Sequence, residues 1–420
     1  MNLFEQFMGK KLTIQIPLWV ILAGPLVFYL GWEGYWYTRV GLGFIKWHTH
    51  IMLYGYGWLA GAWLIYSRHH FSEKRKNIML AFTSTMLVLA LAEISFVITG
   101  SAKVYMEQNT NSYRSPYIPQ DSSWYHTYHP HVPHHITKPE YNYWMPTNSL
   151  GFADREWTTK KAPNQIRITA MGDSFTEGDG APYDSSYVNL LGKKFQTAGY
   201  QVYMMNAGIC ASDPFNNYVL LRDKLLPYKT DYILQVISYN DMAFDILLRG
   251  GMERFKKDGS QQFAKAPFWE PLFAISYISR FFFYQAGYNE LLLPNELTPE
   301  IQNTANKKMA DLLQNYAILC HAQNIKLILF LRPDRDEIIE HQYRYDFSPV
   351  LSALKQDTNV QVVDLMKPYI QYIVRHNASP ADYFWKHDGH HNSAGYEMMA
   401  QTIFESLKLQ EPQAGGSVGL

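Results

Sequence analysis

Apolar residues are distributed unevenly along the chain, in long runs near the N-terminus and in short alternating segments after residue 160. Three runs, at residues 12–30, 51–66 and 78–98, approach the roughly 20 apolar residues that a membrane-spanning helix requires. Residues 31–35 offer no small-residue cleavage pattern after the first run, so we interpret it as an uncleaved anchor. The pattern predicts three transmembrane helices in a membrane domain at residues 1–100.

From residue 160 onward, short β-rich runs alternate with stretches of helical periodicity. We expect strands at residues 166–171, 202–205, 232–237, 326–331 and 360–364, and helices at residues 185–198, 213–226, 300–323 and 393–407. This alternation is typical of βα units around a parallel sheet. It predicts an α/β domain over residues 148–410, in which ligands bind at the carboxyl ends of the strands.

Three further segments do not follow this alternation. Residues 101–147 are rich in Tyr, Pro, Ser and His without periodicity, which predicts an extracytoplasmic linker. Residues 242–298 form an aromatic insert, whose apolar stretch is short for a fourth span and carries Arg280. The insert is either a helix packed on the sheet or a lid or lipid-facing surface. Residues 411–420 are expected to be a flexible tail.

The linker contains a group of histidines that raises the question of a metal site. Prolines interrupt the group and no helix fixes its spacing, so we expect a solvated segment instead. The members are His126, His129, His131, His134 and His135.

Charge and composition narrow the classes of function. The 420 residues include 37 Lys+Arg and 37 Asp+Glu, so there is no basic excess to neutralise a nucleic-acid backbone. Charged residues amount to 18% and aromatic residues to 15%, a combination that favours contact with lipid. Two cysteines, Cys210 and Cys320, exclude a disulfide scaffold and a cysteine-based zinc site.

The distribution of Lys and Arg predicts the membrane orientation. Basic residues precede the first predicted span and crowd the loop between the second and third, and such loops tend to stay cytoplasmic. We therefore expect a cytoplasmic N-terminus and an extracytoplasmic C-terminal domain, periplasmic in a Gram-negative cell. Glu93 lies inside the third predicted span, where it is expected to pair with a neighbouring helix or to stay protonated, with a functional role as the alternative.

A candidate nucleophile follows the first predicted strand of the α/β domain. Gly172-Asp173-Ser174 stands at the carboxyl end of that strand, and a serine hydroxyl attacks only when a base removes its proton. Near the C-terminus, Asp388 precedes His390 and His391 just before the last predicted helix. An aspartate at that spacing can hold an imidazole in the tautomer that accepts the serine proton.

The second and third predicted strands end in residues suited to stabilising an oxyanion. Gly208 ends the first of these turns and Asn240 lies in the second. A backbone N–H and an Asn amide are the donors that acyl transfer requires at the developing negative charge. Each motif alone is equally typical of an ordinary strand-to-loop turn.

Together, these four motifs in this order resemble the SGNH/GDSL hydrolase family, over roughly residues 145–410. The resemblance implies a three-layer α/β/α domain with a five-stranded parallel sheet, the flavodoxin-like SGNH fold. It also implies ester hydrolysis or acyl transfer without a metal or cofactor. Ser174 would be the nucleophile, and its own N–H, the Gly208 N–H and the Asn240 amide would form the oxyanion hole. Phe175 replaces the leucine of the GDSL signature at a packing position.

The resemblance leaves two histidines as candidates for the base. Many members space the pair as Asp-x-x-His, which selects His391, and others as Asp-x-His, which selects His390. The run from His390 through Asn392 to Gly395 resembles the family's usual entry into the final helix, and this favours His390. Asp388 serves either histidine. No base spacing supports Cys210 as an alternative nucleophile.

We therefore expect a membrane-anchored serine esterase or O-acyltransferase that acts on an acylated envelope glycan or a lipid ester. Its expected partners are that substrate, membrane lipids and, through the three spans, a membrane protein, but no nucleic acid. The alternative is a non-catalytic envelope scaffold or binding subunit that retains the fold. Hydrolysis and transfer differ only in the acceptor, so the motifs do not separate them.

Overall fold

The structure is a computed structural model of the whole chain, and it describes residues 72–99, 127–128, 130–255, 276–285, 297–354 and 357–407, with positions 55, 57, 59, 61 and 409. The chain forms two compact units. One consists of Met1–Glu107 with Phe268–Tyr288, and the other of Gln108–Pro267 with Asn289–Leu420. Part of the aromatic insert therefore belongs with the N-terminal residues.

A five-stranded parallel sheet forms the centre of the second unit. Its strands are β3 (Ile166–Met171), β4 (Val202–Asn206), β5 (Tyr232–Ile237), β6 (Lys326–Leu331) and β7 (Val360–Asp364), in the order β4-β3-β5-β6-β7. This order is that of the flavodoxin-like folds. All five strands predicted from the sequence are confirmed, and only β4 is one residue longer than expected.

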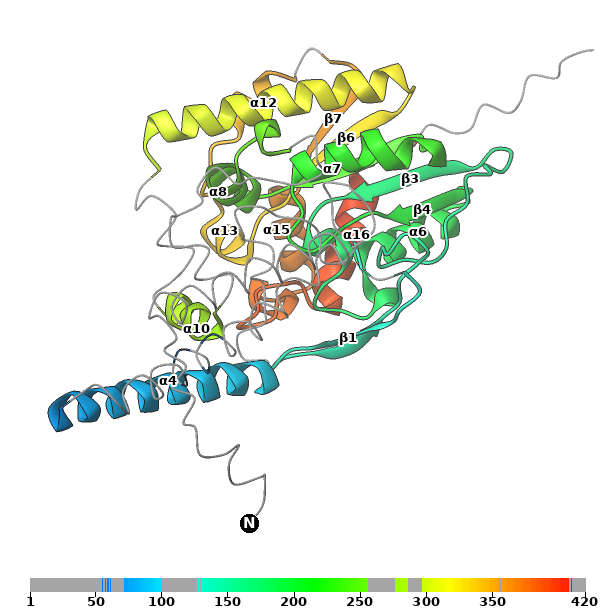
Figure 1. Cartoon of the computed structure of the whole chain (residues 1–420). Helices are drawn as coiled ribbons and strands as arrows, with labels where there is room; N and C mark the ends of the chain where they lie inside the picture. Colours follow the sequence, from blue (N-terminus) through cyan, green and yellow to red (C-terminus); the bar gives the residue numbers. More distant parts are fainter. Residues whose placement is uncertain are drawn as a thin grey trace, which may run out of the picture. The chain divides into compact units, whose positions relative to one another are not determined.

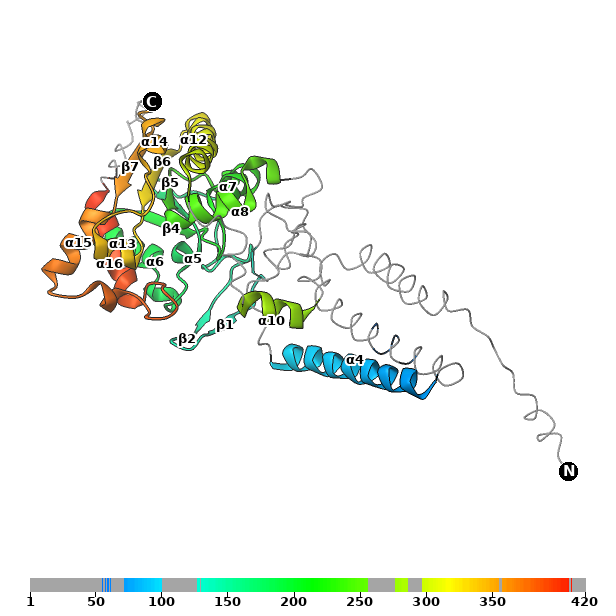
Figure 2. The ribbon, with the colours of Figure 1, turned by 90° about the vertical axis from the view of Figure 1, so that its left-hand side faces the viewer.

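Helices cover both faces of this sheet, so the unit has three layers (Figures 1 and 2). Apolar side chains of α6 (Tyr187–Thr197), α15 (Met366–Arg375) and α16 (Ser393–Ser406) pack on one face. Those of α7 (Pro214–Leu220) and α12 (Pro299–Ala322) pack on the other. β3 and β5 are buried along their whole length, although β3 includes Arg167 and Thr169 and β5 includes Gln235. The α/β/α architecture is confirmed.

Short helical segments make up most of the connections. They are α5 (Ser174–Glu177), η1 (Tyr183–Ser185), η2 (Leu221–Leu225), η3 (Leu226–Tyr228), η4 (Asp241–Asp245), α8 (Ile246–Arg249), η5 (Met252–Arg254), α13 (Arg335–Glu340), α14 (Ser348–Ser352) and η6 (Pro380–Tyr383). The switch in strand order lies between β3 and β5, so the segments after these two strands open at the edge where such folds bind ligands.

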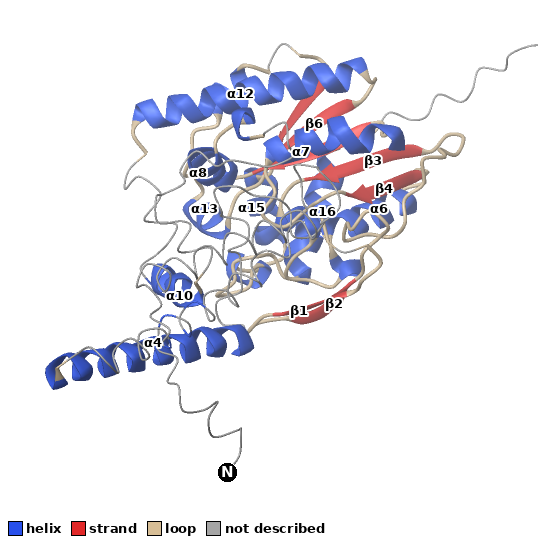
Figure 3. Cartoon of the chain, in the orientation of Figure 1, coloured by secondary structure: helices blue, strands red, loops and turns tan. Residues whose placement is uncertain are grey.

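A β-hairpin lies in the segment that the sequence predicted to be a linker. Its strands β1 (His134–Thr137) and β2 (Asn142–Met145) pair antiparallel and are separate from the main sheet (Figure 3). The sequence predicted a linker here and did not anticipate these two strands. His135 stacks on Trp144, with 4.5 Å between ring centroids. Strands of four residues are too short to show a clear alternation, which is why the pattern missed them.

In the other unit, α4 (Glu73–Thr99) packs against α10 (Tyr277–Gln285). The Glu93 carboxylate is fully buried and accepts hydrogen bonds from Ser276 Oγ at 2.5 Å and from Tyr277 N at 2.8 Å. It therefore caps the N-terminus of α10, as expected of a glutamate that pairs with a neighbouring helix.

The three predicted spans have different outcomes. The third coincides with α4, whereas the first and nearly all of the second lie outside the described residues. Among the helices that the structure describes, none combines the length and apolar character needed to cross a membrane. The membrane arrangement thus stays a prediction from the sequence.

Candidate active site

Ser174 is placed by a sharp turn between β3 and the short helix α5. It is the first residue of that helix, and the Asp173 side chain caps the helix by accepting from Phe175 N at 2.9 Å. The bend leaves room only for a glycine at position 172, because a Cβ there would stand 2.2 Å from Thr176 Oγ1. The half-buried hydroxyl therefore stands at the carboxyl edge of the sheet, as the sequence predicted.

The hydroxyl is hydrogen-bonded to a histidine from the far end of the chain. Ser174 Oγ lies 2.7 Å from His390 Nε2, and His390 Nδ1 contacts Asp388 Oδ1. With Nδ1 bound to a carboxylate, the neutral imidazole presents its Nε2 lone pair to the serine. The structure thus brings together three residues that are up to 216 positions apart in the sequence.

His391 is directed away from this arrangement. Its ring is fully buried among Phe384, Tyr396 and Phe175, and its Nδ1 bonds to Tyr383 O at 3.1 Å. Burial, reinforced by the positive charge of a nearby arginine, lowers the pKa of His391 to about 3. Of the two candidate bases, only His390 contacts the serine.

Asp388 is kept ionised by its surroundings. Burial alone would raise its pKa, but the hydrogen bond from His390 and the charges of His390 and Lys138 outweigh burial and hold the pKa well below its usual range. An ionised carboxylate at this position is suited to stabilising a positively charged imidazole ring.

The two residues predicted for the oxyanion hole are placed differently from each other. The Gly208 N–H already donates to Asn206 Oδ1 at 3.0 Å. A Cβ on Gly208 would stand 2.3 Å from Glu177 N, so this glycine is required for the close approach of α5. Asn240 is exposed at the end of β5, and its side chain has no hydrogen bond to another described residue. Its amide therefore has donors left for a substrate oxygen.

Phe175 contributes more than packing to the site. Its ring centroid lies 4.8 Å from that of His390, and the Arg332 guanidinium carbon lies 3.5 Å from the Phe175 ring. Arg332 is fully buried and follows β6. The Phe175 ring thus contacts both the His390 imidazole and the Arg332 guanidinium, the latter in a cation–π arrangement that the sequence did not reveal.

A buried acid lies at the other end of α5. Glu177 Oε1 accepts from Tyr128 OH at 2.8 Å and Oε2 accepts from Cys210 N at 2.6 Å. Burial, with the charge of nearby Asp179, raises the pKa of Glu177 to about 8. Burial and Glu177 also raise the pKa of the Cys210 thiol, which disfavours a thiolate nucleophile.

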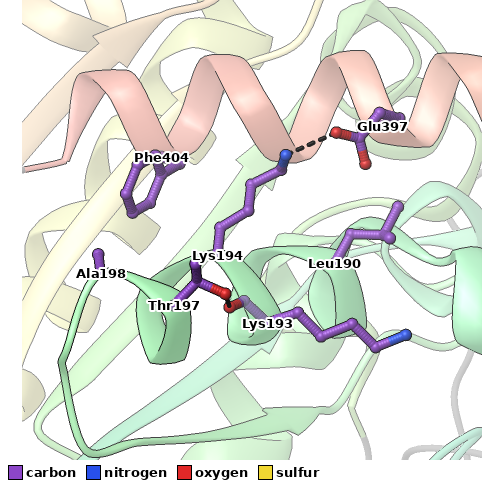
Figure 4. Close-up of a pocket in the computed structure, with 7 residues that line it drawn as sticks. All are labelled: Leu190, Lys193, Lys194, Thr197, Ala198, Glu397 and Phe404. Atoms are coloured by element: carbon purple, nitrogen blue, oxygen red, sulfur yellow. Dashed lines mark hydrogen bonds and ion pairs between the residues drawn. The ribbon is translucent and has the colours of Figure 1, made fainter.

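A second ligand pocket and a metal centre have less support in the structure than the Ser174 site. A hollow of about 530 Å³ lies between α6 and α16, but none of its lining residues belongs to the Ser174 site (Figure 4). Its Lys194 already contacts Glu397 and Gln401, at 2.5 and 2.7 Å. Within the described parts of the chain, no group of three or more His, Cys, Asp and Glu side chains is arranged to hold a metal ion.

Comparisons with known proteins give matches among solved structures only, all at low sequence identity. No family model matches the chain, and no curated protein matches it by sequence. Among solved structures, an acetyl xylan esterase is 17% identical and aligns over 58% of this chain and 100% of its own, with a TM-score of 0.37. A catalytic mutant of an acetylxylan esterase from Geobacillus stearothermophilus is 12% identical over 60% and 97%, with a TM-score of 0.37. A putative lipolytic protein of the G-D-S-L family from Desulfitobacterium hafniense is 14% identical over 58% and 99%, with a TM-score of 0.34.

Proposed function

We propose that the chain is a serine esterase or O-acyltransferase that works through an acyl-serine intermediate. The observation that carries this proposal is the continuous contact from Ser174 Oγ through His390 to Asp388. A serine, an imidazole and an ionised carboxylate in this order are the parts that nucleophilic acyl transfer requires.

The geometry suggests the course of the reaction. His390 Nε2 removes the Ser174 proton as Oγ forms a bond to the ester carbonyl carbon, and the carbonyl electrons move to oxygen. When the tetrahedral intermediate collapses, the bond to the leaving alkoxide breaks and His390 returns the proton to that oxygen. A water or a sugar hydroxyl, deprotonated by His390 in the same way, then attacks the acyl carbon. The bond from that carbon to Ser174 Oγ breaks, and His390 returns the proton to Oγ.

Donors at the carboxyl edge of the sheet stabilise the oxyanion. The Ser174 N–H belongs to the first turn of α5, where N–H groups have no partner within the helix. The Asn240 amide, beyond β5, supplies a second donor. The Gly208 N–H is engaged by Asn206, so we assign Gly208 a role in placing α5 against β4 and no direct donation.

The proposed substrate is an acyl ester at a cell envelope, either an O-acylated glycan or a lipid ester. The support is the combination of this site with the apolar N-terminal runs and the high aromatic content. We further propose that the chain is anchored in the membrane, with its N-terminus cytoplasmic and the Ser174 domain outside. A cysteine introduced near Lys74 tests this, since it should be shielded from an impermeant reagent in intact cells. Labelling there from outside would reverse the orientation.

The reaction itself is tested with the full chain in detergent. We expect turnover of p-nitrophenyl acetate that Ser174→Ala abolishes, and a longer-chain ester distinguishes acetyl from lipid preference. Adding a glycan acceptor separates transfer from hydrolysis, because transfer yields acylated glycan in place of free acid.

The opposite result would favour a non-catalytic subunit. A folded chain without turnover, and without an adduct on Ser174 after treatment with a serine-reactive phosphonate, would leave only a scaffold or binding role for the domain.

A further inference from the structure

The tip of the β1–β2 hairpin contacts the acid of the proposed triad. Lys138 Nζ lies 3.0 Å from Asp388 Oδ2, and Tyr141 OH donates to Asp388 Oδ1 at 2.9 Å. Glu140 Oε2 accepts from His387 N at 2.9 Å and from Asp388 N at 2.7 Å. Three of the four residues at the tip therefore hold the loop that carries Asp388, from about 250 positions earlier in the sequence.

The same tip connects Asp388 to a second carboxylate. Asp179 accepts from Lys138 Nζ at 2.8 Å and from Tyr143 OH at 3.2 Å. Its Oδ1 also lies 3.1 Å from Tyr141 OH, whose single proton it shares with Asp388. Its Oδ2 also lies 3.9 Å from His390 Nε2, on the side of the imidazole that faces the serine. His390 thus lies between two aspartates that share one lysine and one phenol.

We propose that Lys138 and Tyr141 are positioning residues for the Asp388–His390 pair, and that Lys138 sets the charge against which His390 works as a base. The inference rests on the proposed function and concerns how the same site is tuned. Neither residue contacts the serine, so both act through Asp388 and Asp179.

Formal charges give the physical reason. With His390 neutral, the two aspartates and Lys138 sum to one negative charge, and the imidazolium formed during the reaction neutralises it. Without Lys138 two negative charges would face the ring, and an opposite charge within about 4–6 Å favours the protonated imidazole. A protonated ring cannot take the serine proton, so loss of Lys138 would weaken the base.

The hairpin is well suited to this role because its polar atoms are partly shielded from water. The exposed fractions of the Lys138, Asp388 and Asp179 side chains are 20%, 18% and 8%. Burial and the two carboxylates raise the pKa of Tyr141, so the phenol stays a donor. The charged and titratable groups that contact His390 or its two aspartates are Asp388, Asp179, Lys138, Tyr141 and Tyr143. Arg332 and His391 contact the same Phe175 ring as His390.

The test measures the pH dependence of Ser174 labelling by a phosphonate in the full chain in detergent. Lys138→Met should move the acid limb of the rate profile upward by roughly 1 pH unit. Lys138→Arg should restore the limb, because it keeps the charge. Tyr141→Phe removes one hydrogen bond to Asp388 and no charge, so it should shift the limb in the same direction by less. A matched control is Lys161→Met, which removes a lysine paired with Asp231 outside the site and should leave the profile unchanged.

A failure of this inference can be distinguished from a failure of the proposed function. If the wild-type chain is not labelled at Ser174, the proposed function fails. If it is labelled and the acid limb is the same in folded Lys138→Met and Tyr141→Phe, or if Lys138→Arg behaves as Lys138→Met does, the inference is overturned. Should Lys138→Met not fold, Tyr141→Phe is compared with Lys138→Arg. The inference requires the acid limb to move upward in Tyr141→Phe and to stay at its wild-type position in Lys138→Arg, and any other result overturns it.

Discussion

At the scale of single residues, the structure separates two histidines that the sequence left as alternatives. Gly389 has φ +84°, a backbone conformation that suits glycine, and it precedes both histidines. His390 turns to Ser174 while His391 enters the core beside Tyr383. These two neighbours in sequence thus have different surroundings, because His390 contacts Ser174 and His391 packs against Tyr396 of the final helix.

This difference predicts two distinct phenotypes. His390→Ala should nearly abolish phosphonate labelling of Ser174 while the free energy of unfolding stays within about 1 kcal/mol of wild type, because a half-buried side chain is lost. His391→Ala should cost about 2–4 kcal/mol of stability through the cavity it leaves, and its folded fraction should still be labelled. Urea unfolding and intact-mass labelling measure both, and equal loss of labelling in the two folded variants would contradict the assignment.

The raised pKa of Glu177 predicts that the stability of the folded chain depends on pH. Its pKa is about 8 in the folded chain against an ordinary value of 4.5. The folded state therefore holds a proton that the unfolded state has lost between these values, so stability falls as pH rises from about 4.5 to 8. The slope from this group is at most about 1.4 kcal/mol per pH unit.

Glu177→Gln should remove this slope. The amide can still accept from Cys210 N and donate to Tyr128 OH, so the variant should be more stable than wild type at pH 8. Unfolding curves at several pH values check this, with Glu340→Gln on the exposed side of α13 as the control. Parallel curves for wild type and Glu177→Gln would show that Glu177 does not carry the proton.

At the scale of elements, Gly208 allows the turn after β4 to lie close to the backbone of α5. Gly208→Ala should destabilise the domain by more than about 2 kcal/mol, because its Cβ would meet the backbone at Glu177 and Thr176. Labelling of Ser174 should fall with it, since α5 carries the serine. Gly192→Ala provides a comparison in which the new Cβ meets only the flexible side chain of Met204. Full stability in Gly208→Ala would contradict this packing.

The main sheet could be predicted from the sequence because each strand is a short run rich in β-branched and other apolar residues between turn residues. The serine, the histidine and the aspartate were also accessible, since each lies in a short motif at a strand end or a helix start. The hairpin tip was not, because Lys138 and Tyr141 lie in a segment without periodicity and their partners are far along the chain. Arg332 was hidden for a similar reason, as an arginine after a strand gives no sign of an aromatic partner.

At the scale of the whole molecule, one compact unit is built from two separate stretches of the chain, Met1–Glu107 and Phe268–Tyr288. Glu93 on α4 holds the start of α10, which belongs to the aromatic insert. Glu93→Ala should free the N-terminus of α10 at a cost of about 1–2 kcal/mol. Limited proteolysis should then cut the insert faster, while Glu73→Ala at the exposed start of α4 should not change the rate. Equal rates in both variants would show that this cap does not hold the insert.

The central claim is that one serine, activated by His390 and Asp388, forms a covalent acyl intermediate. Mass mapping of the full chain after treatment with a serine-reactive phosphonate tests it most directly. The account predicts a single adduct on Ser174 that is absent in Ser174→Ala and nearly absent in His390→Ala. An adduct on another residue, or none on Ser174 in a folded chain, would contradict it.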